Sequence, residues 1–220
     1  VLDKEMNFSS SLGIPVHGII GYDLFRDYIV EINYSSQYLR FHDPETYTRK
    51  IRRDEVTLPL TLTGNKAFLH GSVVVNNQDE VPVKLLMDTG SSDALWLFPD
   101  AEKGLTVPDK HYEDYLGKGL SGTIYGKRTK IQQVRLGDFV LKEAKAAFPQ
   151  MESFRLATNL GDRNGSAGGE LLKRFNMVVD YPGHRITLSK NALFNKPFQF
   201  NLAGIELEHA GIRYIAERIA

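Results

Sequence analysis

Cysteine is absent from the 220 residues, and this absence removes several kinds of chemistry. Without cysteine the chain forms no disulfide, offers no thiolate nucleophile and holds no cysteine-ligated metal. The six histidines, at positions 17, 42, 70, 111, 184 and 209, form no zinc-binding spacing and no H-E-x-x-H pattern. The G-x-S-x-G nucleophile elbow of many serine hydrolases is missing too. The sequence therefore predicts no metal and no cofactor.

Net charge and long apolar runs are also lacking. Lysine plus arginine and aspartate plus glutamate both number 27, so the chain shows no basic footprint for nucleic acid or an anionic membrane. No run is long and apolar enough to span a bilayer. The basic cluster from Arg49 to Arg53 is interpreted as a solvated linker, with a partner-binding patch as the alternative. A hydrophobic content of 42% still predicts a globular core.

Helical periodicity is scarce, whereas short β-branched or aromatic runs between turn residues are frequent, which predicts a mainly β fold. The predicted strands are Tyr28–Tyr34, Tyr38–Phe41, Val56–Leu62, Phe68–Val75, Val81–Met87, Ala94–Phe98, Lys130–Leu136, Phe139–Ala147, Met177–Asp180 and Arg185–Ser189. The predicted helices are Tyr22–Asp27, His111–Tyr115 and Glu170–Phe175. The charged segment Asp43–Asp54, which contains Pro44, is predicted to be a linker.

An internal repeat organises the chain. The segment Gly18–Phe41 aligns without gaps on Gly165–Leu188, at a constant offset of 147 residues. Each copy reads as glycine, short amphipathic helix, strand ending in Asn-Tyr or Asp-Tyr, turn and second strand. Self-similarity at a fixed distance is typical of repeated structural units, and chance likeness between two β-rich stretches is the alternative. The second copy ends an apparently complete unit, Glu55–Lys190, whereas most of the first unit is missing.

A polar turn, Asp88-Thr89-Gly90-Ser91, stands between two apolar strands. This arrangement places one carboxylate on a rigid β scaffold. Gly90 has no Cβ, so backbone amides can approach the carboxylate. The hydroxyls of Thr89 and Ser91 are expected to hold the neighbouring backbone and the carboxylate oxygens, which favours the ionised form. An ordinary hairpin turn is the alternative, but apolar residues on both sides favour a functional turn.

These residues resemble the retropepsin-like and pepsin-like aspartic proteases, in which Asp-Thr-Gly follows a strand and a later glycine opens a short helix. Ile19-Ile20-Gly21 matches the later pattern, and Ser166-Ala167-Gly168 matches it with smaller side chains. The resemblance covers residues 14–42 and 55–190. It is greatest for two-lobed proteins of Bacteroides-type bacteria, which often carry a PDZ domain. It implies a mainly β fold with a retropepsin-like (acid protease) β-barrel lobe, in an exported or periplasmic protein.

The resemblance also implies an aspartic endopeptidase that cleaves a peptide or protein substrate. Asp88 is then one catalytic carboxylate, and Thr89, Gly90 and Ser91 support it. The chemistry needs a second aspartate, which the repeat offset places roughly 59 residues before Val1, in a first lobe. A second copy of the chain that supplies Asp88 again is the alternative. The 220 residues alone are expected to be inactive, and a non-catalytic peptide-binding module on the same fold is the rival function.

The segment from Gly117 to Gly122 fits G-x-G-x-x-G literally. A dinucleotide site needs a strand before this motif and a helix after it, and here a helix is expected before it and a strand after it. The resemblance instead implies a flap that closes over substrate, with a plain surface hairpin as the alternative. The candidate flap and substrate-binding residues are Gly119, Leu120, Ser121, Gly122, Thr123 and Tyr125.

Three domains are predicted. Residues 1–48 are the C-terminal remnant of a first retropepsin-like lobe plus a linker, and residues 55–190 are a complete second lobe. Residues 191–220 are a linker and the possible start of a PDZ-like domain, because residues 201–220 resemble the first strands of that fold. A C-terminal strand without separate identity is the alternative. Trp96 is interpreted as core or pocket wall, and Asn33 and Asp180 as structural residues at strand ends.

Overall fold

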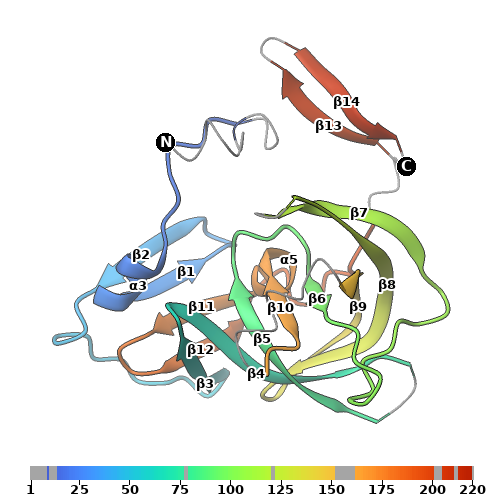
Figure 1. Ribbon diagram of the computed structural model, residues 1–220. Helices are drawn as coiled ribbons and strands as arrows, with labels where there is room; N and C mark the ends of the chain where they lie inside the picture. Colours follow the sequence, from blue (N-terminus) through green and yellow to red (C-terminus); the bar gives the residue numbers. More distant parts are fainter. Residues whose placement is uncertain are drawn as a thin grey trace. The chain divides into compact units, whose positions relative to one another are not determined.

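Figure 1 shows the computed structural model, which describes residue 9 and residues 14–76, 79–119, 122–151, 162–200, 205–210 and 213–219. The chain divides into two compact units. The larger unit holds Tyr22–Phe198, and the smaller one holds residues 1–21 and 199–220. Among the described helices, none combines the length and the apolar character that a membrane span requires.

The larger unit consists mainly of β-strands, as the sequence predicts. Its helices are α3 (Tyr22–Asp27) and α5 (Gly169–Leu172). Its strands are β1 (Ile29–Asn33), β2 (Tyr38–His42), β3 (Glu55–Thr63), β4 (Lys66–Val74), β5 (Val81–Asp88), β6 (Leu95–Leu97), β7 (Tyr112–Gly119), β8 (Gly122–Leu136), β9 (Phe139–Pro149), β10 (Gly165–Gly168), β11 (Phe175–Asp180) and β12 (Arg185–Lys190).

The strands form one continuous sheet in the order β2-β1-β11-β12-β3-β4-β5-β10-β6-β9-β8-β7. An additional pairing of β4 with β8, at Val73↔Val134, closes the strands from β4 to β8 in this order into a barrel. Strand β10 runs parallel to β5 and antiparallel to β6. The candidate site therefore lies on a closed β scaffold, and the predicted β-barrel lobe is confirmed.

Alternate residues of these strands point into one hydrophobic core, as expected for sheets with one buried face. On β11, for example, Phe175, Met177 and Val179 are fully buried, whereas Asn176 and Val178 between them are partly exposed. The aromatic rings of Phe139, Phe175 and Phe194 contact one another at centroid distances of 5.4 to 5.9 Å. This core fixes the strands that carry the polar turn.

The two copies of the internal repeat fold alike. Each forms a short helix followed by a hairpin, α3-β1-β2 in the first copy and α5-β11-β12 in the second. At the end of the first strand, Asn33 Oδ1 accepts a hydrogen bond from Ser36 N at 2.8 Å, and Asp180 Oδ1 accepts one from Gly183 N at 2.7 Å. Both turns then contain a residue with a left-handed backbone, Gln37 (φ 53°) or its equivalent His184 (φ 51°). The structural interpretation of Asn33 and Asp180 agrees with these bonds.

One predicted helix is wrong. Residues 111–115 do not form a helix, because Tyr112–Gly119 is strand β7, which pairs with β8. Aromatic residues favour strands, and the cross-strand pairing outweighs the local spacing that suggested a helix. The literal G-x-G-x-x-G motif, residues 117–122, begins within β7 and ends at the first residue of β8, so it is followed by a strand and not a helix, and the dinucleotide interpretation still fails. The predicted helix Glu170–Phe175 is shorter than expected, since Phe175 already belongs to β11.

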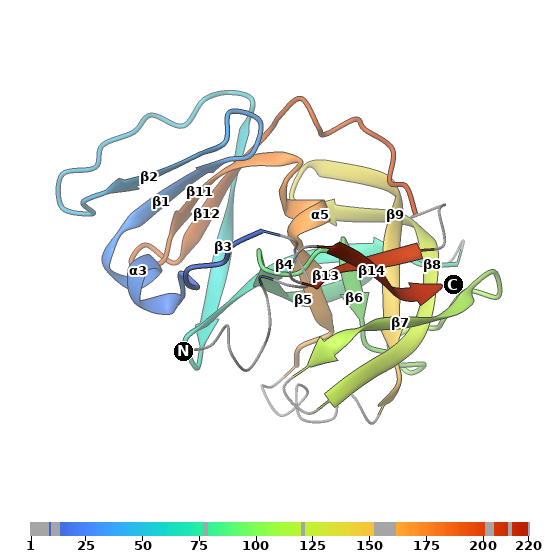
Figure 2. The same cartoon turned by 90° about the horizontal axis from the view of Figure 1, so that it is seen from above.

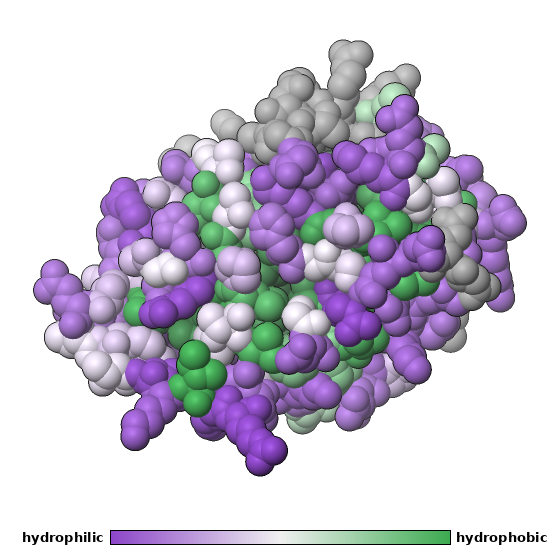
Figure 3. All heavy atoms as spheres, turned by 90° about the horizontal axis from the view of Figure 1, so that it is seen from below, coloured by the Kyte–Doolittle hydropathy of each residue, from purple (hydrophilic) through white to green (hydrophobic). Residues whose placement is uncertain are grey.

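The linker 43–54 has no regular secondary structure, as predicted, but its basic residues are not all solvated. Arg49 and Arg52 both donate to the carboxylate of Glu55 at the start of β3. The side chain of Glu55 is 1% exposed, and Arg52 N also donates to it at 2.8 Å. Two cations of the basic cluster therefore hold the linker in place. In Figure 3, hydrophobic residues show between hydrophilic ones on one face of the molecule.

The smaller unit contains an antiparallel hairpin of β13 (Ile205–Ala210) and β14 (Arg213–Ile219). Two strands near the C-terminus are compatible with the predicted start of a PDZ-like domain and equally with a hairpin of no separate identity. The predicted domain boundaries at 1–48, 55–190 and 191–220 stay predictions.

Candidate functional site

Asp88 is the last residue of β5, at the point where the strand leaves the barrel and turns. Val83 and Leu85 anchor this strand in the core, so the position of Asp88 is set by a rigid element. Its carboxylate accepts a hydrogen bond from Gly90 N at 3.2 Å, and its backbone carbonyl accepts one from Ser91 N at 3.3 Å. Asp88 is half-buried, which leaves part of the carboxylate accessible to a reactant.

The loop after Asp88 rests on the beginning of α5. Three backbone amides donate to it: Gly168 N to Ala94 O at 2.9 Å, Gly169 N to Ser91 O at 2.7 Å, and Glu170 N to Asp93 O at 3.2 Å. The amides at the start of a helix have no partner within the helix, so the loop carbonyls satisfy them. The Asp88 turn is thereby attached to a segment about eighty residues further along the chain.

Small residues on β10 make this close contact possible. Ser166 and Ala167 are buried between the strands that enter and leave the turn, with Ala167 opposite Met87 on β5. A Cβ added at Gly165 would lie 1.9 Å from Trp96 O, and one at Gly168 would lie 2.2 Å from Asp93 O. Larger side chains at these positions would force the loop away from α5.

The predicted supporting residues Thr89, Gly90 and Ser91 form the turn directly after Asp88. Thr89 and Gly90 are exposed at the tip of the turn, and Gly90 donates to the carboxylate through its backbone amide. The hydroxyl of Ser91 accepts a hydrogen bond from Asp93 N at 3.3 Å, so it organises the loop rather than the carboxylate. Backbone amides, more than hydroxyls, therefore position Asp88 here.

A buried ionic cluster joins the loop to the next hairpin. The guanidinium of Arg128 on β8 donates to Asp93 in the loop and, at 2.5 Å, to Asp114 on β7. Trp96 Nε1 donates to the other oxygen of Asp93 at 2.6 Å. The side chains of Arg128, Asp93 and Asp114 are 17%, 14% and 8% exposed. Burial lowers the pKa of Arg128, but the two carboxylates outweigh this effect and raise it overall, so Arg128 is charged.

The hairpin β7–β8 contains the predicted flap. Gly119 pairs with Gly122 at its end, and Tyr115 pairs with Tyr125 nearer the barrel. The rings of these two tyrosines contact each other edge to face at a centroid distance of 6.0 Å, and Tyr125 is 53% exposed. The backbone of Gly119, Gly122 and Thr123 belongs to the paired strands, whereas Leu120 and Ser121 lie outside the described residues. The structure thus contains a hairpin at this place, and its role as a flap stays a prediction.

Arg163 is a second cation near the turn. Its guanidinium donates to Gly165 O at 2.9 Å and to the hydroxyl of Ser166 at 2.6 Å, and it lies over the ring of Phe98. Burial lowers the pKa of Arg163 below its usual value, and attraction to the carboxylate of Asp88 acts in the opposite direction. Arg163 is therefore a partly buried positive charge whose hydrogen bonds go to Gly165 and Ser166 on β10.

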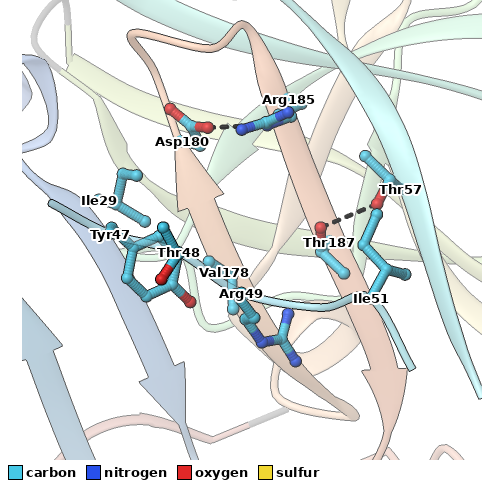
Figure 4. A pocket seen from close by; sticks show the side chains of 10 residues that line it. All are labelled: Ile29, Tyr47, Thr48, Arg49, Ile51, Thr57, Val178, Asp180, Arg185 and Thr187. Atoms are coloured by element: carbon cyan, nitrogen blue, oxygen red, sulfur yellow. Dashed lines mark hydrogen bonds and ion pairs between the residues drawn. The ribbon is translucent and has the colours of Figure 1, made fainter. Parts of the chain in front are cut away.

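A separate cavity of about 330 Å³ lies under the linker, on the face of the sheet opposite the core. Figure 4 shows its lining, which includes Asp180, Arg185, Thr57 and Thr187. Asp180 accepts a hydrogen bond from Arg185 at 2.8 Å, and the two threonine hydroxyls bond each other at 2.9 Å. Because these polar groups satisfy one another and Asp88 is not among the lining residues, the cavity is separate from the candidate site.

Sequence reasoning missed the residues that tie the site together. Asp93 and Trp96 lie within eight residues of Asp88, but Asp114 and Arg128 belong to a different hairpin. Trp96, interpreted as core or pocket wall, uses its indole N–H to hold Asp93. The nearness of Asp93 and Trp96 to the Asp88 turn was the signal available in the sequence. A single sequence does not show which strand lies opposite these two residues.

Asp88 thus lies at the end of a barrel strand, on a loop bonded to the beginning of α5 and tied through Arg128 to the β7–β8 hairpin. Residues 72–165 match a family model described as aspartyl protease. This match spans fewer than half of the residues and supports a protease-type function. A retropepsin-like aspartic protease from Rickettsia conorii is a similar solved structure, with 21% identity, a TM-score of 0.42, and coverage of 61% of this chain and 98% of that one. No curated protein matches the chain.

Proposed function

We propose that the chain supplies one half of an aspartic endopeptidase site, with Asp88 as its catalytic carboxylate. The observation that carries this proposal is the position of Asp88 at the end of β5, on a loop that α5 holds through three backbone hydrogen bonds. A carboxylate used in catalysis must keep its orientation while substrate binds, and strands and helix ends provide that rigidity.

The proposed chemistry needs two carboxylates that share one proton and bind one water. Two such groups at close range do not both ionise at low cost, so one stays protonated. The ionised carboxylate removes a proton from the water as the water attacks the peptide carbonyl, and the protonated carboxylate donates a hydrogen bond to the carbonyl oxygen. Collapse of the tetrahedral intermediate breaks the C–N bond, and the amine leaves with a proton from the pair. The two groups titrate as one unit.

The second carboxylate comes from a homologous lobe in the same polypeptide, at the repeat equivalent of Asp88, and a second copy of the chain is the other source. The proposed substrate is an extended peptide, which the strands beside the turn can bind through backbone hydrogen bonds. The residues proposed to cover the peptide are Gly119–Tyr125. The salt bridges of Arg128 attach the base of the β7–β8 hairpin to the loop that follows Asp88. Closure of the far end of the hairpin would then bring a bound peptide onto Asp88.

The test compares the product of the complete reading frame with its Asp88→Asn variant on a peptide library at mildly acidic pH, with cleavage read by mass spectrometry. Asp138→Asn is the matched control, because Asp138 is an exposed aspartate in the turn between β8 and β9. We expect cleavage by the parent and the control and none by Asp88→Asn. Equal cleavage by all three proteins would refute the assignment. Peptide binding without cleavage by any of them would support the rival function, a non-catalytic peptide-binding module.

A further inference from the structure

Arg174, between α5 and β11, is a buried cation for which the proposed mechanism has no use. It is 2% exposed, and among the described residues it forms no salt bridge. The carboxylate of Glu170, in the first turn of α5, pairs instead with Lys145 on β9 at 2.5 Å. A buried charge is costly unless hydrogen bonds compensate it, so the groups that bind the guanidinium show what Arg174 holds in place.

Backbone carbonyls of the segment after β12 compensate this charge. The guanidinium donates hydrogen bonds to Leu193 O at 3.1 Å, Phe194 O at 3.4 Å, Pro197 O at 3.5 Å and also Lys196 O. Its carbon lies 3.6 Å from the ring centroid of Phe198, which is 3% exposed. Residues 191–198, here called the latch, are therefore arranged around one side chain. Figure 2 shows the latch leaving β12 and passing α5.

The first residue of the latch is attached to the other end of the same segment. Asn191 Nδ2 donates to Lys173 O at 2.8 Å, and Asn191 N donates to Arg174 O at 3.2 Å. The last carbonyls of a helix have no partner within it, and Lys173 is the C-cap residue of α5. The latch therefore caps α5 through Asn191 and binds Arg174 through its later carbonyls.

The contacts continue from Arg174 through α5 to the candidate site. Arg174 Nε donates to Glu170 O at 3.2 Å, and Glu170 N donates to Asp93 O at 3.2 Å. The neighbouring amide, Gly169 N, donates to Ser91 O in the turn that follows Asp88. Helix α5 is a single turn, which is too short to be stable by itself. Its position therefore depends on the contacts at its two ends, the latch at one and the Asp88 loop at the other.

We propose that Arg174 is a positioning residue of the proposed half-site, which holds the latch against α5 and thereby sets the orientation of Asp88. Release of the latch would leave the guanidinium without its acceptors and α5 without its cap, so the loop on α5 would lose its alignment. The chain continues from the latch at Gln199 into the smaller unit. A movement that draws Gln199 away would thus lower the activity. This inference rests on the proposed function for its effect on cleavage, whereas the attachment of the latch follows from the contacts alone.

The kinetic test uses four variants of the product of the complete reading frame. Arg174→Met removes the donors, and Phe198→Ala removes the ring from the latch side. We expect each to lower kcat for a cleaved peptide by about tenfold or more and to leave KM within about twofold, because the carboxylate is displaced and the peptide-binding strands are not. Arg174→Lys keeps a charged donor, so it should restore part of kcat. Val73→Ala on β4 is the control for lost stability, since it alters a buried residue outside α5 and the latch.

The two latch variants are also combined. Because Arg174→Met and Phe198→Ala release the same segment, the double variant should have a kcat close to that of the worse single variant. Hydrogen exchange then measures the latch without reference to activity. The amides of Gly169 and Glu170, which donate to the Asp88 loop, should exchange about tenfold or more faster in both latch variants, whereas the Leu85 amide of β5 should keep its parental rate.

Unchanged exchange at Gly169 and Glu170 would overturn the latch. Faster exchange with parental kcat would overturn the positioning role, and so would an equal fall of kcat in Val73→Ala. If Arg174→Met does not fold, Phe198→Ala carries the same test, because it leaves every hydrogen-bond donor of the guanidinium in place. Faster exchange in the variants of a parent that cleaves no peptide would support the latch and count against the proposed function.

Discussion

Replacing Arg128 with methionine tests how firmly the β7–β8 hairpin is tied to the loop that carries Asp88. Methionine fills much of the same volume, but it leaves the carboxylates of Asp93 and Asp114 buried without their shared cation. Removal of one partner of a buried ion pair costs about 3 to 5 kcal/mol. Since these side chains are 8% to 17% exposed, we expect a loss near the lower end, roughly 3 kcal/mol. For a chain of this size that corresponds to a fall in Tm of roughly 6 to 12 °C.

The assay is reversible unfolding of the 220-residue chain in urea, with hydrogen exchange of the β7 and β8 amides measured in parallel. Combining Arg128→Met with Asp114→Asn removes one of the orphaned carboxylates, so the double variant should recover about 1 kcal/mol or more of the lost stability. Arg128→Lys is the matched control that keeps the charge. A lysine ammonium lacks the planar fork that reaches two carboxylates at once, so this variant should lie between the parent and Arg128→Met.

Two results would refute this reasoning. A change of less than about 0.5 kcal/mol for Arg128→Met would mean that the cluster behaves like an exposed surface pair. Strictly additive effects of Arg128→Met and Asp114→Asn would mean that the two side chains do not interact. In either case the hairpin would need another attachment to the loop that carries Asp88, and the proposed function would lose its account of how the flap is aligned.

Two further predictions concern the scaffold. Gly168→Ala would place a Cβ 2.2 Å from Asp93 O. We therefore expect the free energy of unfolding, measured in urea, to fall by about 1 to 3 kcal/mol, and the full-length protein to cleave peptides more slowly. Parental values for both measurements would show that the loop does not need this close contact. Burial raises the pKa of Glu55, but the bonds from Arg52 and Arg49 outweigh burial and lower it below its ordinary 4.5. Its stabilising contribution is therefore present above pH 4.5 and lost as pH falls through the lowered value. Glu55→Gln should flatten the dependence of Tm on pH between about 5 and 3, and an unchanged pH profile would contradict this account.

The strands were predictable because their signal is local. In the predicted strand Met177–Asp180, the apolar residues at 177 and 179 indicate one buried face, and the structure buries both in β11, which begins two residues earlier, at Phe175. The segment 111–115 shows the limit of such a signal. Tyr112 and Tyr115 have a spacing that suits a helix, but their conformation is decided by pairing with residues 125–128, which no local pattern reveals. Strand pairing between distant segments therefore explains this error.

The candidate site was also predictable from the sequence only in part. Asp88 and its turn could be found from the sequence, because the motif and the apolar strands around it are contiguous. The groups that hold the turn come from other segments: Gly168 donates to it from β10, and Arg128 binds it from β8. The Ser91 hydroxyl was expected to hold neighbouring backbone, and it accepts a hydrogen bond from Asp93 N. Local sequence identifies a reactive group, whereas its support depends on the topology of the barrel.

The helix–hairpin repeats of this chain are related by a local twofold axis, and the proposed chemistry also needs two equivalent carboxylates. Two carboxylates can share a proton only if they lie within hydrogen-bond reach of each other, and a twofold axis between two lobes brings two equivalent turns together with one scaffold used twice. The axis through Glu31↔Val178 already relates the helix–hairpin units of this chain. A second lobe related by this axis would carry its own equivalent of Asp88 to the far side of it. Under the proposed function, the exposure of Leu39 and Phe41 and the single carboxylate Asp88 of the described site have one explanation, a second lobe on that axis.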